Sequence, residues 1–240
     1  MISLHEPKFI GNEKKYLDKC YKSAWISTSG IFIKKFEKQI INYTKSKYCV
    51  ALNSCTSSLH IALKVVGVKE KDEVISSTVS FVSPINAIKY NNAEPIFFDT
   101  DENLNIDQDK VIEFIKTKTF FRNGKTYNKT SRRKISALII IHVFGNAVKF
   151  EKLFNLCKKR KIKIIEDAAE SFGTFYKTGK FRNKHTGTIG DIGCFSFNGN
   201  KIITTGGGGA ILTKKYSDAK KARYLISQAK DNAKIYLHNS

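Results

Sequence analysis

Short runs of apolar and β-branched residues alternate along this chain with longer segments in which apolar residues recur at helical spacing. The runs predict seven strands, at Tyr48–Leu52, Glu73–Ser76, Pro95–Asp99, Ala137–His142, Ile162–Glu166, Ile192–Phe197 and Ala210–Thr213. The other segments predict seven helices, at Asn12–Lys22, Ile33–Tyr43, Ser57–Val66, Pro84–Asn91, Asp107–Lys116, Phe150–Lys161 and Ser217–Lys230. Helices of this length between strands indicate crossover connections. The alternation therefore predicts an α/β fold with a mostly parallel seven-stranded sheet flanked by helices.

The location of a ligand site follows from this architecture. In open sheets with crossover connections, ligands bind beyond the carboxyl ends of the strands. Polar motifs that directly follow predicted strands are therefore the candidate site residues. The 240 residues suffice for one large domain with a sizeable core.

The formal net charge of +21 allows two interpretations. A basic surface would suit an anionic partner, either nucleic acid or a nucleotide-linked sugar. Alternatively, the lysines are a compositional excess on solvated faces, which their spread along the chain favours. Their densest group, between Arg122 and Lys134, is interpreted as a polar surface insertion. Because basic and aromatic residues do not gather on one predicted face, we expect no nucleic-acid partner.

Neither a membrane span nor a secretion signal is apparent in the sequence. No apolar run approaches the roughly 18 residues that a spanning helix needs, and the first residues lack a basic region followed by an apolar stretch. We therefore expect a cytoplasmic protein without a membrane partner. None of the five cysteines forms a C-x-x-C pair, which predicts reduced thiols and no zinc or other metal site.

One lysine stands in an unusual sequence context. Lys201 follows the aromatic and serine residues at the end of a predicted strand and precedes four consecutive glycines, Gly206–Gly209. Lysines are abundant here, so position rather than residue type is informative. A lysine beside small residues that admit a ligand close to the backbone suits covalent attachment of a carbonyl cofactor.

Three more segments combine polar or aromatic residues with predicted strand ends. Glu166 and Asp167 end a predicted buried strand. They are either solvated residues of the following turn or part of a ligand site. Thr56 and Ser57 open a predicted helix, where hydroxyls and free amides either cradle a phosphate or cap the helix. Phe81 follows another strand and would be a core residue if it stood alone.

Taken together, these segments resemble the DegT/DnrJ/EryC1/StrS family of sugar aminotransferases, which use pyridoxal phosphate (PLP). The resemblance runs over essentially the whole chain, with the motifs in family order and spacing. The string from Phe195 to Gly209 is most similar to the branch that aminates nucleotide-linked 4-keto sugars on the way to legionaminic acid. The resemblance implies a fold-type-I, aspartate-aminotransferase-like large domain.

The resemblance also implies a role for each candidate residue. Lys201 would hold PLP, and Asp167 would keep its pyridine nitrogen protonated. Phe81 would stack on the ring. The phosphate would be bound by Thr56, Ser57 and Ser196. Glu170 stands near the ring oxygen, where many relatives have glutamine, and Cys55 replaces a usual glycine.

The expected partners come from the same resemblance. An amino acid, expected to be glutamate, would give its amino group to the 4-keto group of a nucleotide-linked deoxysugar. Dehydratase relatives carry histidine in place of the lysine, so Lys201 favours transamination. Relatives form homodimers with shared active sites.

The domain organisation is also predicted from the resemblance. Residues 1–240 would form the PLP-binding large domain, with an N-terminal segment over 1–45. In relatives a smaller C-terminal domain follows a segment like His238-Asn239, and we expect it to be absent here. A weakly active or inactive remnant, and a nucleic-acid-binding protein, are the alternatives. His142 is either near the cofactor or a core residue, and Trp25–Gly30 resembles a substrate-side loop.

Overall fold

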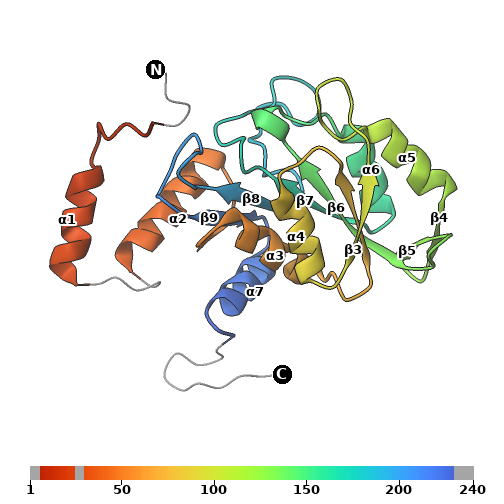
Figure 1. Cartoon of the computed structure of the whole chain (residues 1–240), viewed down its shortest axis with the longest axis horizontal. Coiled ribbons are helices and arrows are strands. Elements are labelled where there is room, and N and C mark those ends of the chain that lie inside the picture. Colours follow the sequence, from red (N-terminus) through yellow and green to blue (C-terminus); the bar gives the residue numbers. More distant parts are fainter. Residues whose placement is uncertain (1–5, 25–29, 230–240) are drawn as a thin grey trace.

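Nine strands form one sheet in the computed structural model, which describes residues 6–24 and 30–229 (Figure 1). Seven of them follow the order β1-β9-β8-β7-β6-β2-β3. Their bounds are β1 Tyr48–Leu52, β2 Glu73–Ser77, β3 Glu94–Phe98, β6 Lys134–Ile141, β7 Lys163–Asp167, β8 Ile192–Ser196 and β9 Gly209–Thr213. The remaining two, β4 Thr119–Arg122 and β5 Lys125–Asn128, form a hairpin that pairs with β6. All seven predicted strands are therefore confirmed.

The sheet is mixed. The four pairings from β3 through β2, β6 and β7 to β8 are parallel, as predicted. β9 runs antiparallel to both β8 and β1. The reason is the connection: a loop rather than a helix joins β8 to β9, so the chain returns beside the strand it has just left.

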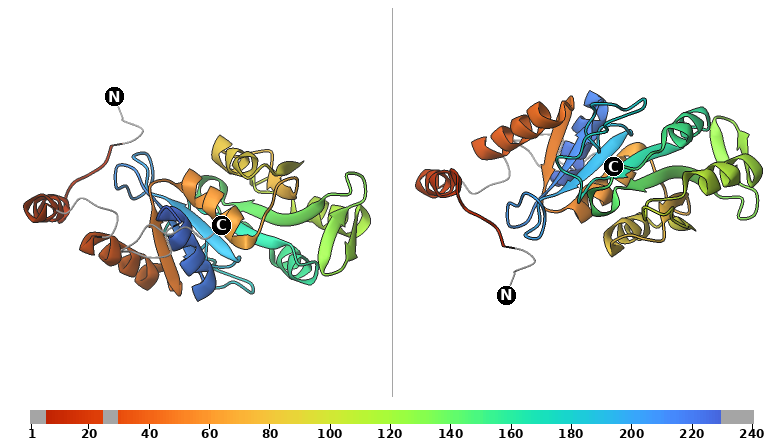
Figure 2. Two further views of the ribbon diagram at one scale, coloured as in Figure 1. Left: turned by 90° about the horizontal axis from the view of Figure 1, so that it is seen from below. Right: turned by 90° about the horizontal axis from the view of Figure 1, so that it is seen from above.

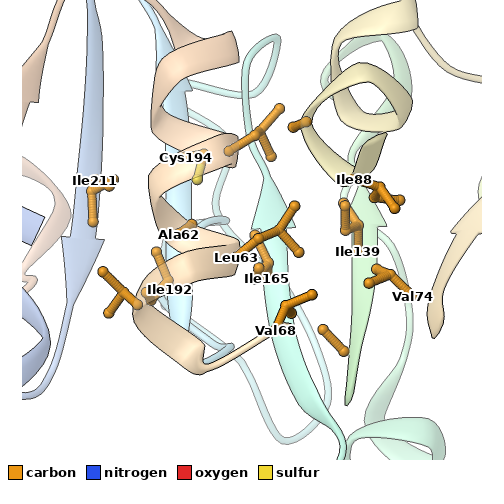
Figure 3. Close-up of a cluster of buried hydrophobic side chains, with 14 of the residues drawn as sticks. Ala62, Leu63, Val68, Val74, Ile88, Ile139, Ile165, Ile192, Cys194 and Ile211 are labelled. Atoms are coloured by element: carbon orange, nitrogen blue, oxygen red, sulfur yellow. The ribbon is translucent and has the colours of Figure 1, made fainter. Parts of the chain in front are cut away.

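Helices cover both faces of the sheet. Their bounds are α1 Glu13–Ser23, α2 Ile31–Thr44, α3 Cys55–Val66, α4 Val82–Tyr90, α5 Gln108–Thr117, α6 Glu151–Lys159 and α7 Tyr216–Ile226. α3, α4 and α7 share one core cluster with strand residues such as Ile139, Ile165 and Ile211 (Figure 3). α5 and α6 pack against alternate residues of the same strands, including Leu138 and Ile140. α2 packs on a third cluster, with Phe195 and Leu212 of β8 and β9. Alternation along each buried strand thus supplies apolar residues to both faces of the sheet.

The N-terminal end of the described chain is set apart from this body. α1 has no buried residue, and its Tyr16 ring meets Phe32 of α2 edge-on at 5.7 Å. The views of Figures 1 and 2 place α1 at the opposite end of the molecule from the β4–β5 hairpin. Among the described helices, none is long and apolar enough to cross a membrane.

Two predictions about elements need correction. The last helix ends at Ile226 rather than Lys230, because Gln228 and Ala229 adopt positive φ and Ser227 lies outside the helical region. The segment interpreted as a polar insertion contains most of the β4–β5 hairpin, with Asn123 and Gly124 as its turn. Both turn residues have positive φ, as a two-residue type I′ turn requires.

Candidate active site

A cavity of about 520 Å³ opens where five strands reach their carboxyl ends. Its walls come from the segments that follow β1, β2, β6, β7 and β8. Six of the seven predicted site residues line it: Thr56, Phe81, Asp167, Glu170, Ser196 and Lys201. Ser57, the seventh, is not among the lining residues. The fold thus gathers side chains that lie up to 145 positions apart in the sequence (201 minus 56).

Lys201 lies in the loop between β8 and β9, and its side chain is 19% exposed. Its Nζ is 3.3 Å from Oε1 of Glu170. The other carboxylate oxygen, Oε2, accepts a hydrogen bond of 2.9 Å from the backbone amide of Phe144. Glu170 is therefore fixed from two sides and holds the lysine amine at the cavity.

The turn that supplies this amide is unusual. Phe144 has φ +50°, in the left-handed region, and its side chain is 74% exposed. Gly145, with φ +82°, lies so close that an added Cβ would be 3.0 Å from the Glu170 carbonyl oxygen. Non-glycine residues with such φ are uncommon and are enriched at functional sites. The turn brings an aromatic ring and a backbone donor to the same lip of the cavity.

Asp167 ends β7 and is buried at the base of the cavity. Burial raises the pKa of this carboxyl to about 6, although the amide of Ala169 and the positive charges around it act in the opposite direction. Its Oδ1 accepts from the Ala169 amide at 3.1 Å, and the Cys55 thiol lies 3.9 Å away. Among the residues that the structure describes, none donates to Oδ2. No cation of the described residues forms an ion pair with this carboxyl, so the positive charges around it offset only part of the cost of burial.

The start of α3 faces the same cavity. Ser54 caps the helix: its hydroxyl accepts from the Ser57 amide at 3.1 Å and donates to the Ser57 hydroxyl at 3.0 Å. The alternative that Thr56 or Ser57 caps the helix is therefore wrong. Thr56 instead donates to the Ser83 hydroxyl at 3.0 Å, and both line the cavity. The first amides of a helix have no partner within it, so this end can bind an anion.

Glycines of the Gly206–Gly209 run serve two purposes: one allows close packing against α3, and another lines the cavity. A Cβ at Gly209 would overlap the Ser54 carbonyl and the Cys55 amide, so β9 can pass the start of α3 only without a side chain. Gly208, in contrast, lines the cavity. Part of the run thus positions α3 rather than admitting a ligand directly.

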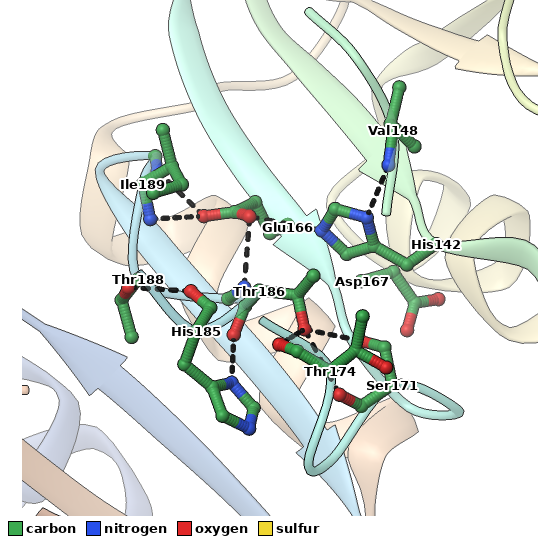
Figure 4. Close-up of polar contacts among 12 residues, drawn as sticks. His142, Val148, Glu166, Asp167, Ser171, Thr174, His185, Thr186, Thr188 and Ile189 are labelled. Carbon is green, nitrogen blue, oxygen red and sulfur yellow. Dashed lines mark hydrogen bonds and ion pairs between the residues drawn. The ribbon is translucent and has the colours of Figure 1, made fainter. Parts of the chain in front are cut away.

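His142 is buried and hydrogen-bonded in the core (Figure 4), and it also lines the cavity, so the structure does not choose between the two alternatives left open by its sequence context. The Val148 amide donates to Nδ1 at 3.2 Å, so the proton of the neutral ring is on Nε2, which donates to Glu166 at 3.0 Å. Glu166 also accepts from the amides of Gly187, Ile189 and Gly190. Burial alone would raise the pKa of Glu166, but these hydrogen bonds lower it.

The two acids of β7 thus have different tasks, because neighbouring residues of a strand point to opposite faces. Glu166 organises the core around the 187–190 turn, and Asp167 faces the cavity. Both are buried, so the alternative of a solvated acidic turn is wrong.

Several lining residues were not predicted from the sequence. Ser83, Phe144, Asn198 and Asn200 all border the cavity. Asn198 and Asn200 flank the lysine in the sequence, and Ser83 lies two residues after Phe81, so proximity to the predicted residues was the available signal. The Trp25–Gly30 segment lies mostly outside the described residues.

Comparisons with known proteins agree with this geometry. The model of the "DegT/DnrJ/EryC1/StrS aminotransferase family" matches residues 7–240. GDP-perosamine synthase of Escherichia coli O157:H7 is 37% identical over 212 residues, which cover 88% of this chain and 53% of that protein. A UDP-4-amino-4,6-dideoxy-N-acetyl-beta-L-altrosamine transaminase of Campylobacter jejuni is 32% identical and covers 84% of this chain and 49% of its own length.

A solved structure supports the fold independently. An aminotransferase from Psychrobacter cryohalolentis superposes with a TM-score of 0.79 at 26% identity, over 98% of this chain and 58% of that one. The chain therefore spans about half to three-fifths of the length of the proteins it matches.

Proposed function

The chain belongs to the DegT/DnrJ/EryC1/StrS aminotransferase family, and from this we propose that it is part of an enzyme that aminates a nucleotide-linked sugar with the help of PLP. The amino group would come from an amino acid, glutamate in our proposal, and go to the 4-keto carbon of a deoxysugar. The observation that carries the proposal is the convergence of Lys201, Asp167 and Phe81 on one cavity.

The residues present fit the cofactor. Asp167 is a desolvated carboxyl without a cationic partner, and a protonated pyridine nitrogen would supply one. Phe81 is 77% exposed at the cavity, so one face of its ring is free to stack. The start of α3, with Thr56 and Ser83, offers amides and hydroxyls for a phosphate. Ser196 borders the cavity, and Ser57 follows Thr56 in α3. Both remain proposed phosphate ligands.

When bound, PLP supplies an electron sink for the bonds at the amino-bearing carbon. Asp167 would bind and orient the ring nitrogen. Lys201 Nζ would hold the cofactor and then move a proton at the reacting carbon. Glu170, 3.3 Å from that amine, would keep the amine in position after it releases the cofactor and before it moves the proton. Two exposed lip residues, Phe81 and Phe144, would limit the access of water.

The pathway is a narrower proposal. The likeness of the Phe195–Gly209 string to the legionaminic-acid branch supports a place in nonulosonate or surface-glycan biosynthesis. GDP- and UDP-linked sugars both occur in the names of the relatives, so the nucleotide is left to experiment. Residues 1–240 would be the cofactor-binding large domain of a cytoplasmic homodimer, with 1–45 as its N-terminal segment.

Reductive labelling tests the cofactor site. The chain is incubated with PLP, treated with borohydride and digested, and the labelled peptide is identified by mass spectrometry. We expect the label on Lys201 and its loss in Lys201→Ala. Lys214 is the matched control, because burial lowers its pKa and so favours the neutral amine that reacts with an aldehyde. Label on Lys214, or an undiminished label in Lys201→Ala, would contradict the proposal.

A second measurement tests the substrate. Glutamate is supplied with a GDP- or UDP-linked 4-keto-6-deoxysugar, and amino-sugar formation is followed by mass spectrometry. If the chain is labelled at Lys201 but aminates neither sugar, the proposed reaction is contradicted, while the proposed cofactor site is not.

A further inference from the structure

The β4–β5 hairpin lies at the end of the molecule opposite α1 (Figures 1 and 2), and none of its residues lines the cavity. No aspartate or glutamate occurs between Glu113 and Glu151, a stretch that contains the whole hairpin. Six cations of this region are exposed and have no carboxylate partner within the described chain: Lys116, Lys118, Arg122, Lys125, Lys129 and Arg132. Lys134 is different, because it pairs with Asp72 at 2.8 Å.

The two faces of the hairpin differ. Thr126 is buried and donates to the carbonyl oxygen of Arg160, so its face packs on the body. On the opposite face Phe120 and Tyr127 stack at 5.4 Å, and Arg132 lies 5.9 Å from the Phe120 ring centre. Because side chains alternate along a strand, Arg122 and Lys125 project on this outer face with the stacked pair.

Two cations face each other at the tip of the hairpin, which destabilises the folded hairpin when no anion is bound. Arg122 and Lys125 stand directly opposite each other in the ladder. Like charges in such a pair repel and destabilise a hairpin. An anion lying across the tip would remove this repulsion. Phe121, next to Arg122, projects on the opposite face with its ladder partner Thr126, but it is 44% exposed and so adds an apolar group at the edge of the tip.

We propose that the outer face and tip of the β4–β5 hairpin bind the surface of an anionic lipid bilayer. Four to eight clustered cations attract anionic headgroups, each contributing on the order of 1 kcal/mol. An exposed aromatic residue beside them suits the interface between headgroups and acyl chains. Single-stranded nucleic acid fits less well, because stacking covers one face each of Phe120 and Tyr127 and the Arg132 guanidinium lies over the Phe120 ring, which leaves few ring faces for bases.

This inference revises the expectation of no membrane partner. That expectation rested on the absence of a spanning segment, and surface association through a cationic hairpin needs none. The proposal is independent of the reaction at the cavity, because the hairpin supplies none of the cavity's lining residues.

Vesicle flotation tests it with the 240-residue chain. Vesicles of phosphatidylcholine alone are compared with vesicles that also contain phosphatidylglycerol, at low and at high salt. We expect binding only to the anionic vesicles, and its loss when salt rises from about 0.1 M to about 1 M. The Arg122→Gln, Lys125→Gln variant should bind about ten- to thirtyfold more weakly.

Two further variants keep the test specific. Lys34→Gln, Lys38→Gln on α2 removes the same charge from exposed positions far from the hairpin and should bind like the wild type. The charge-preserving Arg122→Lys, Lys125→Arg variant should also retain binding. Equal loss in the α2 variant, equal binding to neutral vesicles, or binding to an RNA oligonucleotide but to no vesicle would each overturn the proposal.

Discussion

At the scale of single residues, the burial of Asp167 makes stability depend on pH. Its pKa is raised to about 6 in the folded chain, from the ordinary aspartate value of 3.8. Between these two values the folded state binds the proton more tightly, so the contribution of Asp167 to stability falls as pH rises from about 4 to above 6. Asp167→Asn, which stays neutral, should therefore gain about 3 kcal/mol relative to wild type between pH 4 and pH 7.

The measurement is denaturant unfolding of the cofactor-free chain across this pH range. Asp99→Asn is the control, because hydrogen bonding to Lys110 lowers the pKa of that exposed carboxyl, and its pH effect should have the opposite sign. A pH-independent difference between Asp167→Asn and wild type would mean that Asp167 is solvated or paired in solution.

Two buried histidines should differ in tautomer. His142 accepts a hydrogen bond at Nδ1 from Val148, so its proton is on Nε2. His185 accepts at Nε2 from the Gly173 amide at 2.8 Å, so its proton is on Nδ1 and is donated to the Thr186 carbonyl. Burial also lowers the pKa of His185, so its ring should stay neutral to lower pH than an exposed histidine ring. Long-range proton–nitrogen NMR spectra distinguish the two tautomers, and identical tautomers would contradict the hydrogen-bond network.

At the scale of elements, the hairpin turn offers a prediction about backbone strain. Gly124 has φ +71°, and an added Cβ would meet nothing within 4 Å. Gly124→Ala should therefore cost about 1–2 kcal/mol through the left-handed conformation alone. Gly199→Ala, which has an ordinary φ and no close contact, should cost less than about 0.5 kcal/mol. Thermal unfolding of both variants checks the difference, and equal stability would mean that the turn adjusts freely.

The same hairpin marks how far the sequence predicts the elements. Periodicity located all seven strands of the main sheet path and all seven helices, mostly to within two residues, because all of these elements except α1 pack apolar residues against a hydrophobic cluster. The hairpin has no such face, but Asn123-Gly124 between two β-prone segments was a usable turn signal. The reversed direction of β9 depends on a loop connection, which periodicity does not report.

The candidate site was predicted in a different way. Residues at the ends of predicted strands were expected to converge, and six of them line one cavity. The sequence could not assign hydrogen-bond partners, which depend on the folded backbone. It therefore left open that Ser54 rather than Thr56 caps α3, and that Glu170 is held by the amide of Phe144.

At the scale of the whole molecule, the net charge of +21 is large for 240 residues. Several ion pairs in the described part of the chain have both partners exposed, such as Lys14–Asp18 and Lys89–Glu94, and such pairs contribute little. Long-range repulsion among the remaining cations should then be the main electrostatic term that opposes folding.

Salt should accordingly stabilise this protein. At about 0.1 M salt, screening limits the repulsion to distances of about 10 Å. Screening also weakens the exposed ion pairs, but these contribute little stability in the first place. Raising sodium chloride from about 0.01 M to about 0.3 M should increase the free energy of unfolding by on the order of 1 kcal/mol, or about 2–4 °C in Tm. Calorimetry with sodium chloride measures this, and sulfate is avoided because it strengthens apolar burial by another mechanism. A Tm that falls as sodium chloride is added would contradict this prediction. It would mean that attraction within ion pairs, including the pair of Arg223 with the buried Glu37, stabilises the fold more than the net repulsion destabilises it.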